Sequence, residues 1–218
     1  MISWGQLMES KRYLSIVSAC EADLEKYGDN YRGVGWTKSK EDVDRRYQVM
    51  LGVIKEDAVG KVRLLDFGCG ASHLYEYILR NRITTIEYSG LDLSEKFINL
   101  SKGKYPRNDY YCMDILSDSV RLPAFDYVVM NGVFNFKGEL PFDEMFVYLQ
   151  ALIGAVVPLA RVGIAFNVMS KQVDWERDDL FHLSFDALGS FLKESVSRDF
   201  VFRHDYGLYE YTTYVYKG

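Results

Sequence analysis

The fold of this chain is set by the segment Leu64-Leu65-Asp66-Phe67-Gly68-Cys69-Gly70-Ala71-Ser72. A short apolar run ends there in two glycines, which allow the backbone to turn tightly and to approach a ligand closely. Ser72 stands where a dinucleotide-binding fingerprint has its third glycine, so the full fingerprint is missing. The glycine pair alone fits either a ligand-binding turn or a plain turn between a strand and a helix.

Short apolar runs alternate with helical patterns from this segment to the end of the chain. We expect strands at 62–67, 87–92, 109–113, 125–130, 162–169, 200–204 and 209–216. Helices are expected at 72–79, after Ser94, at 142–157 and at 184–194. This order predicts an α/β, Rossmann-like fold with a seven-stranded, mostly parallel sheet and helices on both faces. The last two strands should form an antiparallel edge hairpin.

The part of the chain before Gly60 lacks this alternation of strand and helix patterns. Its apolar residues recur near the helical period, and a turn-rich segment at 27–36 separates two expected helices, the second at about 38–57. We therefore divide the chain into N-terminal helices, residues 1–58, that extend or cap the fold, and a Rossmann-like domain, residues 59–218.

Composition narrows the class of protein. The 218 residues carry a formal net charge of −5, whereas nucleic-acid binders usually need a basic surface. Three cysteines lie far apart and form no CxxC pair, which favours a reducing compartment over a disulfide framework. The N-terminus has no long apolar region of the kind found in signal peptides.

One apolar stretch, residues 151–169, needs to be weighed as a membrane span. It is interrupted by Pro158, Arg161 and Asn167, and a span needs about 20 apolar residues. A helix end followed by a buried strand explains it better. We expect a soluble, cytoplasmic protein, a monomer or homodimer, with no membrane or nucleic-acid partner.

Polar residues mark the ends of the first four expected strands: Asp66, Asp92, Asp114 and Asn131. An acidic residue ending the second strand can accept hydrogen bonds from both hydroxyls of a ribose. Asp114 is placed to accept from an adenine amino group. Because these residues are not basic, they indicate an adenosine ligand without phosphates.

The motifs LLDFGCGAS, SGLDLS, YYCMDI and FDYVVMNGVF, in this order within about residues 60–170, resemble those of class I S-adenosylmethionine-dependent methyltransferases. The resemblance implies S-adenosylmethionine as cofactor and S-adenosylhomocysteine as product. The glycine turn with Asp66 would hold the methionine end, Asp92 the ribose, and Asp114 with Ile115 the adenine. The full set of implied cofactor-binding residues is Asp66, Phe67, Gly68, Cys69, Gly70, Asp92, Leu93, Asp114, Ile115, Asn131 and Val133.

The segments GDNYRGVGW, FNVMSKQVDWERDDLFHL and RHDYGLYEYTTYVYK are similar to those of a bacterial small-molecule subgroup associated with surface-polysaccharide modification. The chain departs from other branches of the class. After the fourth strand it reads Asn131-Gly132-Val133-Phe134, without the prolines of the base- and glutamine-directed amino methyltransferases. It has no evident Asp-Asn metal pair, so we expect no metal.

Three segments could form an acceptor pocket: residues 31–36, the long loop 170–183, and the closing hairpin. Each has a plainer interpretation as helix packing, a solvated charge run or sheet packing. An arginine guanidinium can form two parallel hydrogen bonds with a phosphate or a carboxylate, and a histidine can act as a base near neutral pH. The candidate substrate-binding residues are Arg32, Trp36, Trp175 and Arg177. The candidate catalytic residues are His182 as base, Asn131 and Tyr206, whereas His73 is expected to be structural.

The sequence therefore predicts a methyltransferase that modifies a hydroxyl or amine of a small polar metabolite, such as a sugar or a surface-polysaccharide precursor. The alternatives are a protein or RNA methyltransferase and a non-catalytic module that binds S-adenosylmethionine.

Overall fold

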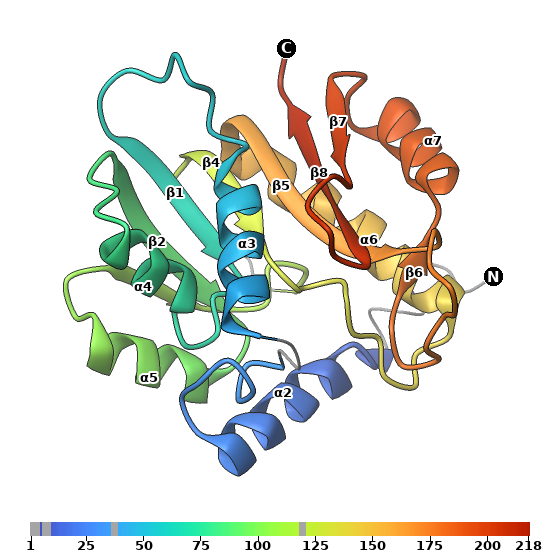
Figure 1. Ribbon diagram of the computed structural model, residues 1–218, viewed down its shortest axis with the longest axis horizontal. Helices are drawn as coiled ribbons and strands as arrows, with labels where there is room; N and C mark the ends of the chain where they lie inside the picture. Colours follow the sequence, from blue (N-terminus) through green and yellow to red (C-terminus); the bar gives the residue numbers. More distant parts are fainter. Residues whose placement is uncertain (1–4, 6–9, 36–38, 118–120) are drawn as a thin grey trace.

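The computed structural model describes residues 5, 10–35, 39–117 and 121–218. Its strands form one sheet in the order β3-β2-β1-β4-β5-β8-β7, and a two-residue strand, β6, pairs with the far end of β5 (Figure 1). The bounds are β1 Val62–Phe67, β2 Ile86–Asp92, β3 Asp109–Cys112, β4 Phe125–Met130, β5 Ala160–Ser170, β6 His182–Leu183, β7 Phe200–Arg203 and β8 Glu210–Tyr216.

The sheet confirms the predicted architecture. Neighbours from β3 to β5 run parallel, and β8 is antiparallel to both β5 and β7. The seven strands of the main path are those expected from the sequence, and β6 is the eighth strand, which the sequence did not reveal. The strand order reverses between β1 and β4, and open α/β sheets bind ligands at such a switch point, beyond the carboxyl ends of the strands.

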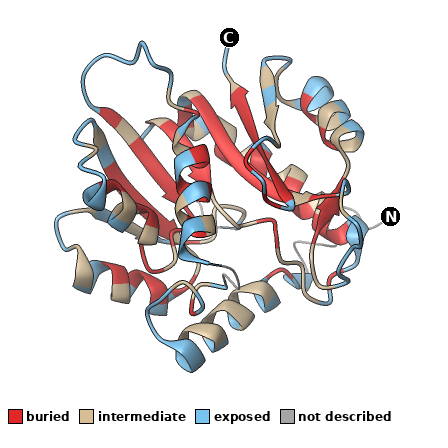
Figure 2. Cartoon of the chain, viewed as in Figure 1, coloured by how far each residue is buried: buried red, intermediate tan, exposed pale blue. Residues whose placement is uncertain are grey.

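Helices cover both faces of the sheet. The described helices are α2 Leu14–Tyr27, α3 Lys40–Leu51, α4 His73–Arg80, α5 Glu95–Lys104, α6 Phe142–Val156 with the 3-10 turn Val157–Leu159, and α7 Phe185–Ser195. One hydrophobic cluster joins α3 and α4 to the sheet, and the other joins α6 and α7 to it. Buried residues concentrate on the strands and on the helix faces turned toward them (Figure 2). Ser94 and Ser184 are the N-caps predicted from the sequence.

The two N-terminal helices differ in how they join the fold. Helix α3 is part of the core, because Tyr47 and Met50 are buried in one cluster with Leu64 of β1. It ends at Leu51, earlier than the predicted residue 57. The division proposed at residues 58/59 thus separates α3 from the core it packs against. Helix α2 has no buried residue and lies across the carboxyl-end side of β1 and β2 (Figure 1).

The segment Phe142–Leu159, which is α6 and the turn after it, is long and apolar enough to cross a membrane by length and composition alone. Its residues Met145, Leu149, Leu152 and Ile153 are buried in the core against the sheet. This is the packing of a core helix. The stretch weighed in the sequence, residues 151–169, is the end of α6 followed by the buried strand β5, as predicted.

Candidate active site

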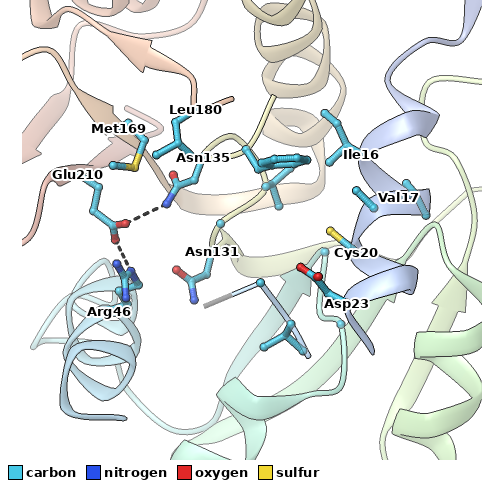
Figure 3. A pocket seen from close by; sticks show the side chains of 18 of the residues that line it. Ile16, Val17, Cys20, Asp23, Arg46, Asn131, Asn135, Met169, Leu180 and Glu210 are labelled. Carbon is cyan, nitrogen blue, oxygen red and sulfur yellow. Dashed lines mark hydrogen bonds and ion pairs between the residues drawn. The ribbon is translucent and has the colours of Figure 1, made fainter. Parts of the chain in front are cut away.

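A cavity of about 730 Å³ lies at the carboxyl ends of the central strands. Residues following β1, β2 and β4 line it on one side, and α2 contributes Ile16, Val17 and Cys20 on another. The end of β5, the loop before β6 and the start of β8 complete the wall. Figure 3 shows α2 facing Glu210 and Met169 across the cavity. Binding sites for small molecules typically measure about 300–1,000 Å³.

The glycine turn after β1 adopts a conformation that favours glycine. Gly68 and Gly70 have φ angles of +75° and +50°, in the left-handed region. The N–H groups of Gly68 and Cys69 both donate to the carbonyl of Leu91, at 2.7 and 3.0 Å. A Cβ on Gly68 would lie 2.7 Å from Val133 Cγ2. The turn therefore has the backbone conformation that favours glycine, and its close approach is to the side chain of Val133.

Asp92, at the end of β2, braces this turn. Its Oδ2 accepts from the Gly70 N–H at 2.8 Å and its Oδ1 from the Ser94 N–H at 2.9 Å. Burial raises the pKa of Asp92, although these N–H groups favour the carboxylate. A carboxylate has about four lone-pair sites, so Asp92 can accept a further hydrogen bond from a ligand in the cavity.

Asp66 and Cys69 line the same end of the cavity. Burial raises the pKa of Asp66 to about 7, while the Tyr88 hydroxyl, 2.8 Å from Oδ2, opposes that shift by donating a hydrogen bond. Burial likewise raises the pKa of the Cys69 thiol. The cysteine is therefore held as a neutral thiol, which is a poor nucleophile.

The residues expected at the adenine do not line the cavity. Asp114 accepts from the hydroxyls of Tyr13 and Ser117 at 2.7 and 2.6 Å, and neither Asp114 nor Ile115 is among the lining residues. Tyr13 stacks on Tyr148 with ring centroids 4.9 Å apart, and both of these rings line the cavity. Tyr13 is the N-cap residue of α2, and its hydroxyl donates to Asp114. The aromatic ring of Tyr13, rather than the Asp114 carboxylate, therefore lines the cavity at this point.

The opposite end of the cavity holds a polar cluster that the sequence did not reveal. Glu210 of β8, 1% exposed, accepts from Arg46 Nε of α3 at 2.8 Å. It also accepts from Asn135 Nδ2 at 2.9 Å and from Asn167 Nδ2 at 3.0 Å. Arg46, Asn135 and Glu210 all line the cavity. The only sequence signal is that Asn167 and Glu210 interrupt apolar or aromatic strands.

His182 is not placed as a base. Its Nδ1 lies 2.7 Å from the Ser170 carbonyl, which can only accept, and its Nε2 accepts from the Arg177 N–H at 3.2 Å. These partners define a neutral ring with Nδ1 protonated. No lone pair remains for a substrate proton in this arrangement. The geometry corrects the expected role: His182 lines the cavity and holds the loop 170–183 against β5.

The same loop carries two of the expected substrate-binding residues. Trp175 and Arg177 both line the cavity, and Trp175 is 69% exposed at its rim. The Arg177 guanidinium forms two hydrogen bonds with Asp179, from Nε to Oδ1 at 3.0 Å and from the terminal nitrogen to Oδ2. The Arg177 guanidinium, which was expected to hold an anionic acceptor, is thus already bonded to the Asp179 carboxylate.

The other expected pocket residues lie elsewhere. Tyr206 is buried in the core with its hydroxyl 3.0 Å from Thr212 Oγ1, and it does not line the cavity, which corrects its assignment as catalytic. Arg32 is exposed and is likewise not a lining residue. Trp36 lies outside the described residues. His73, which was expected to be structural, pairs with Asp29 at 2.8 Å and does line the cavity.

Comparisons with known proteins show what the chain is similar to. Residues 65–156 match a family model described as a methyltransferase domain. The mostly parallel sheet, its antiparallel edge and the flanking helices form the Rossmann-like methyltransferase fold. Over residues 65–156 the chain is similar to a methyltransferase domain, and solved methyltransferases of the same fold bind S-adenosylmethionine or S-adenosylhomocysteine.

Individual similar proteins have low sequence identity to this chain. Rv1506c of Mycobacterium tuberculosis, whose name assigns it provisionally to the methyltransferases, is 28% identical over 158 residues, 70% of this chain and 92% of that protein. Magnesium protoporphyrin IX methyltransferase from Synechocystis PCC 6803, solved with S-adenosylhomocysteine, matches with a TM-score of 0.64 and 14% identity. The match covers 94% of this chain and 100% of that enzyme's chain. The amino pentose methyltransferase CalS10 from Micromonospora echinaspora, solved with S-adenosylmethionine, matches with a TM-score of 0.56 and 15% identity, over 86% and 94% of the two chains.

Proposed function

We propose that this protein transfers the methyl group of S-adenosylmethionine to a hydroxyl or amine of a small polar metabolite, with a sugar or a surface-polysaccharide precursor as the expected acceptor. One observation carries this proposal. A single cavity joins the glycine turn and Asp92 at one end to the buried cluster around Glu210 at the other. The first end suits a nucleoside cofactor, and the second offers polar contacts to a second molecule.

The residues at the first end fit the cofactor. S-adenosylmethionine supplies a methyl group activated on a positively charged sulfonium. Asp23, Asp66 and Asp92 line this part of the cavity, and carboxyl groups in place of basic side chains suit a cation rather than a phosphate. We assign the ribose hydroxyls to Asp92 and the methionine end to the Gly68–Gly70 turn with Asp66. We assign the adenine to the aromatic wall of Tyr13 and Tyr148, in place of Asp114.

The size of the cavity supports a small acceptor. A volume of about 730 Å³ roofed by α2 suits a cofactor and a metabolite better than a protein or RNA chain. CalS10, an amino pentose methyltransferase, has a similar fold, which supports a sugar acceptor. Placing two reactants in line supplies about 7–11 kcal/mol toward such a reaction.

Transfer of a labelled methyl group tests the proposal. The protein is incubated with methyl-labelled S-adenosylmethionine and a bacterial lysate separated into small molecules, protein and RNA. We expect label in the small-molecule fraction, and its mass identifies the acceptor. Label in protein or RNA would replace the proposed acceptor class. Binding of the cofactor without transfer to any fraction would favour a non-catalytic module.

A further inference from the structure

The cluster around Glu210 forms a chain of hydrogen bonds that reaches the middle of the cavity. Figure 3 shows Glu210 between Arg46 and Asn135, with Asn131 lying between this group and Cys20 and Asp23 of α2. Asn167, buried in β5, connects Glu210 to Asn131. Its Nδ2 is 3.0 Å from Glu210 Oε1 and 3.3 Å from Asn131 Oδ1.

The orientation of the Asn167 amide follows from its partners. A carboxylate can only accept, and a backbone N–H can only donate. Asn167 therefore turns Nδ2 toward Glu210 and Oδ1 toward the Gly132 N–H, at 2.7 Å. A flipped amide would oppose oxygen to oxygen at one contact and nitrogen to nitrogen at the other. The buried Glu210 carboxylate thus fixes the polarity of Asn167.

Asn167 in turn fixes Asn131. The second hydrogen on Asn167 Nδ2 requires an acceptor, so Asn131 turns its Oδ1 toward Asn167. The Asn131 Nδ2 then faces away from this contact, and no described residue accepts a hydrogen bond from it. Asn131 is partly exposed and lines the cavity beside Gly68 and Val133. It offers the cavity a hydrogen-bond donor where the cofactor end meets the acceptor end.

Both arginines at the acceptor end already have carboxylate partners, and Asp174 adds a further carboxylate to the lining. Arg46 is paired with Glu210, and Arg177 with Asp179. An anionic acceptor would have to displace a carboxylate from one of these arginines and then lie beside it. A protonated amine has no lone pair for Asn131 Nδ2 to bind. An uncharged hydroxyl compound meets neither obstacle, because its oxygen accepts a hydrogen bond and carries no charge.

We propose that the methyl acceptor is an uncharged hydroxyl compound and that Asn131 donates a hydrogen bond from Nδ2 to its reacting oxygen, in a position fixed by Glu210 and Asn167. This inference rests on the proposed function. In the reaction the carbon–oxygen bond forms and the carbon–sulfur bond breaks, with its electron pair left on sulfur. The hydroxyl proton passes to water. Asn131, which the sequence placed among the cofactor-binding residues, is here assigned to the acceptor and contributes by orienting its oxygen.

Separation by charge tests the acceptor class. The small-molecule fraction of the lysate is divided by ion exchange into neutral, anionic and cationic pools before each pool meets the protein and methyl-labelled S-adenosylmethionine. We expect label in the neutral pool. Label confined to the anionic or cationic pool overturns this inference but leaves the proposed function intact. Label only in macromolecules, or nowhere, overturns both.

An exchange of donor for acceptor tests Asn131 itself. In Asn131→Asp an oxygen can still accept from Asn167, but the group facing the cavity becomes a carboxylate. We expect label transfer to the neutral pool to fall at least 30-fold (about 2 kcal/mol), with S-adenosylhomocysteine affinity by calorimetry within about threefold of wild type. Asn99→Asp, on the exposed face of α5, is the matched control and should change neither quantity.

The pH dependence of the Asn131→Asp activity distinguishes a hydrogen bond donated to the acceptor from a purely structural role of Asn131. A protonated aspartic acid donates a hydrogen bond, and its ordinary pKa is about 3.9. The activity of Asn131→Asp relative to wild type should therefore rise as pH falls from about 8 to about 5. A ratio that does not change with pH, or a variant as active as Asn99→Asp, overturns the role of Asn131. Melting temperatures establish that both variants are folded.

Discussion

The two ends of the cavity are built in different ways. At the cofactor end, Gly68, Gly70 and Asp92 lie within 25 residues of one another and are joined by backbone hydrogen bonds. At the acceptor end, Glu210 meets Arg46 from 164 positions away and Asn167 from 43. The first end is a local consequence of a glycine turn. The second exists only after β5, β8 and α3 have packed together.

The largest expected effect lies at the acceptor end. Glu210→Ala removes a buried carboxylate and leaves the Arg46 charge without it, which typically costs about 3–5 kcal/mol. Denaturant unfolding should show a loss of stability in that range. The double variant Arg46→Met with Glu210→Ala should recover part of the loss, because no buried charge then remains uncompensated. If the single variant is as stable as wild type, the buried pair does not organise this end.

At the cofactor end, stability should depend on pH through Asp66. Its raised pKa, about 7, means that the folded protein binds this proton more tightly than the unfolded chain. The cost of ionising Asp66 is absent below about pH 4, grows toward pH 7 and is constant above it. Asp66→Asn should therefore be more stable than wild type by about 1–3 kcal/mol at pH 8 and nearly equal to it at pH 4. Asp109→Asn, at an exposed position of β3, is the control. If the stability difference between Asp66→Asn and wild type does not change with pH, the raised pKa of Asp66 is contradicted.

The glycine turn allows a matched pair of substitutions. Gly68→Ala places a Cβ 2.7 Å from Val133 Cγ2 at a φ of +75°, and such strain costs about 1–3 kcal/mol. Gly154→Ala, in α6 with no atom near the added Cβ, should instead stabilise the protein by about 0.5–1 kcal/mol. Thermal unfolding compares the two. Equal effects of both substitutions would mean that the turn can relax.

The smallest expected effect concerns His182. Because both ring nitrogens are bonded to the loop backbone, His182→Gln should keep label transfer within about threefold of wild type, whereas loss of a general base costs about 10²–10⁴-fold. The pH profile of the reaction should also be unchanged. A hundredfold loss with an unchanged melting temperature would restore His182 as the base and break the assignment of the loop.

The sequence predicted the cofactor end better than the acceptor end for a physical reason. Strand ends and glycine turns are local signals, and β1 and β4 have the predicted bounds. The exception is Asp114, whose side chain is bonded by Tyr13, a residue 101 positions away. No local pattern reports such a contact. For the same reason Arg46 and Asn135 were missed, and Tyr206 was assigned to a site that its packing in the core excludes.

The most direct test measures the affinity of S-adenosylmethionine for two variants side by side by calorimetry. Asp92→Ala removes the carboxylate assigned to the ribose, and Asn131→Asp alters the donor assigned to the acceptor. We predict at least a tenfold loss of affinity (about 1.4 kcal/mol) for Asp92→Ala and a change below threefold for Asn131→Asp. Unchanged affinity in Asp92→Ala, or a larger loss in Asn131→Asp, would contradict the division of the cavity into a cofactor end and an acceptor end.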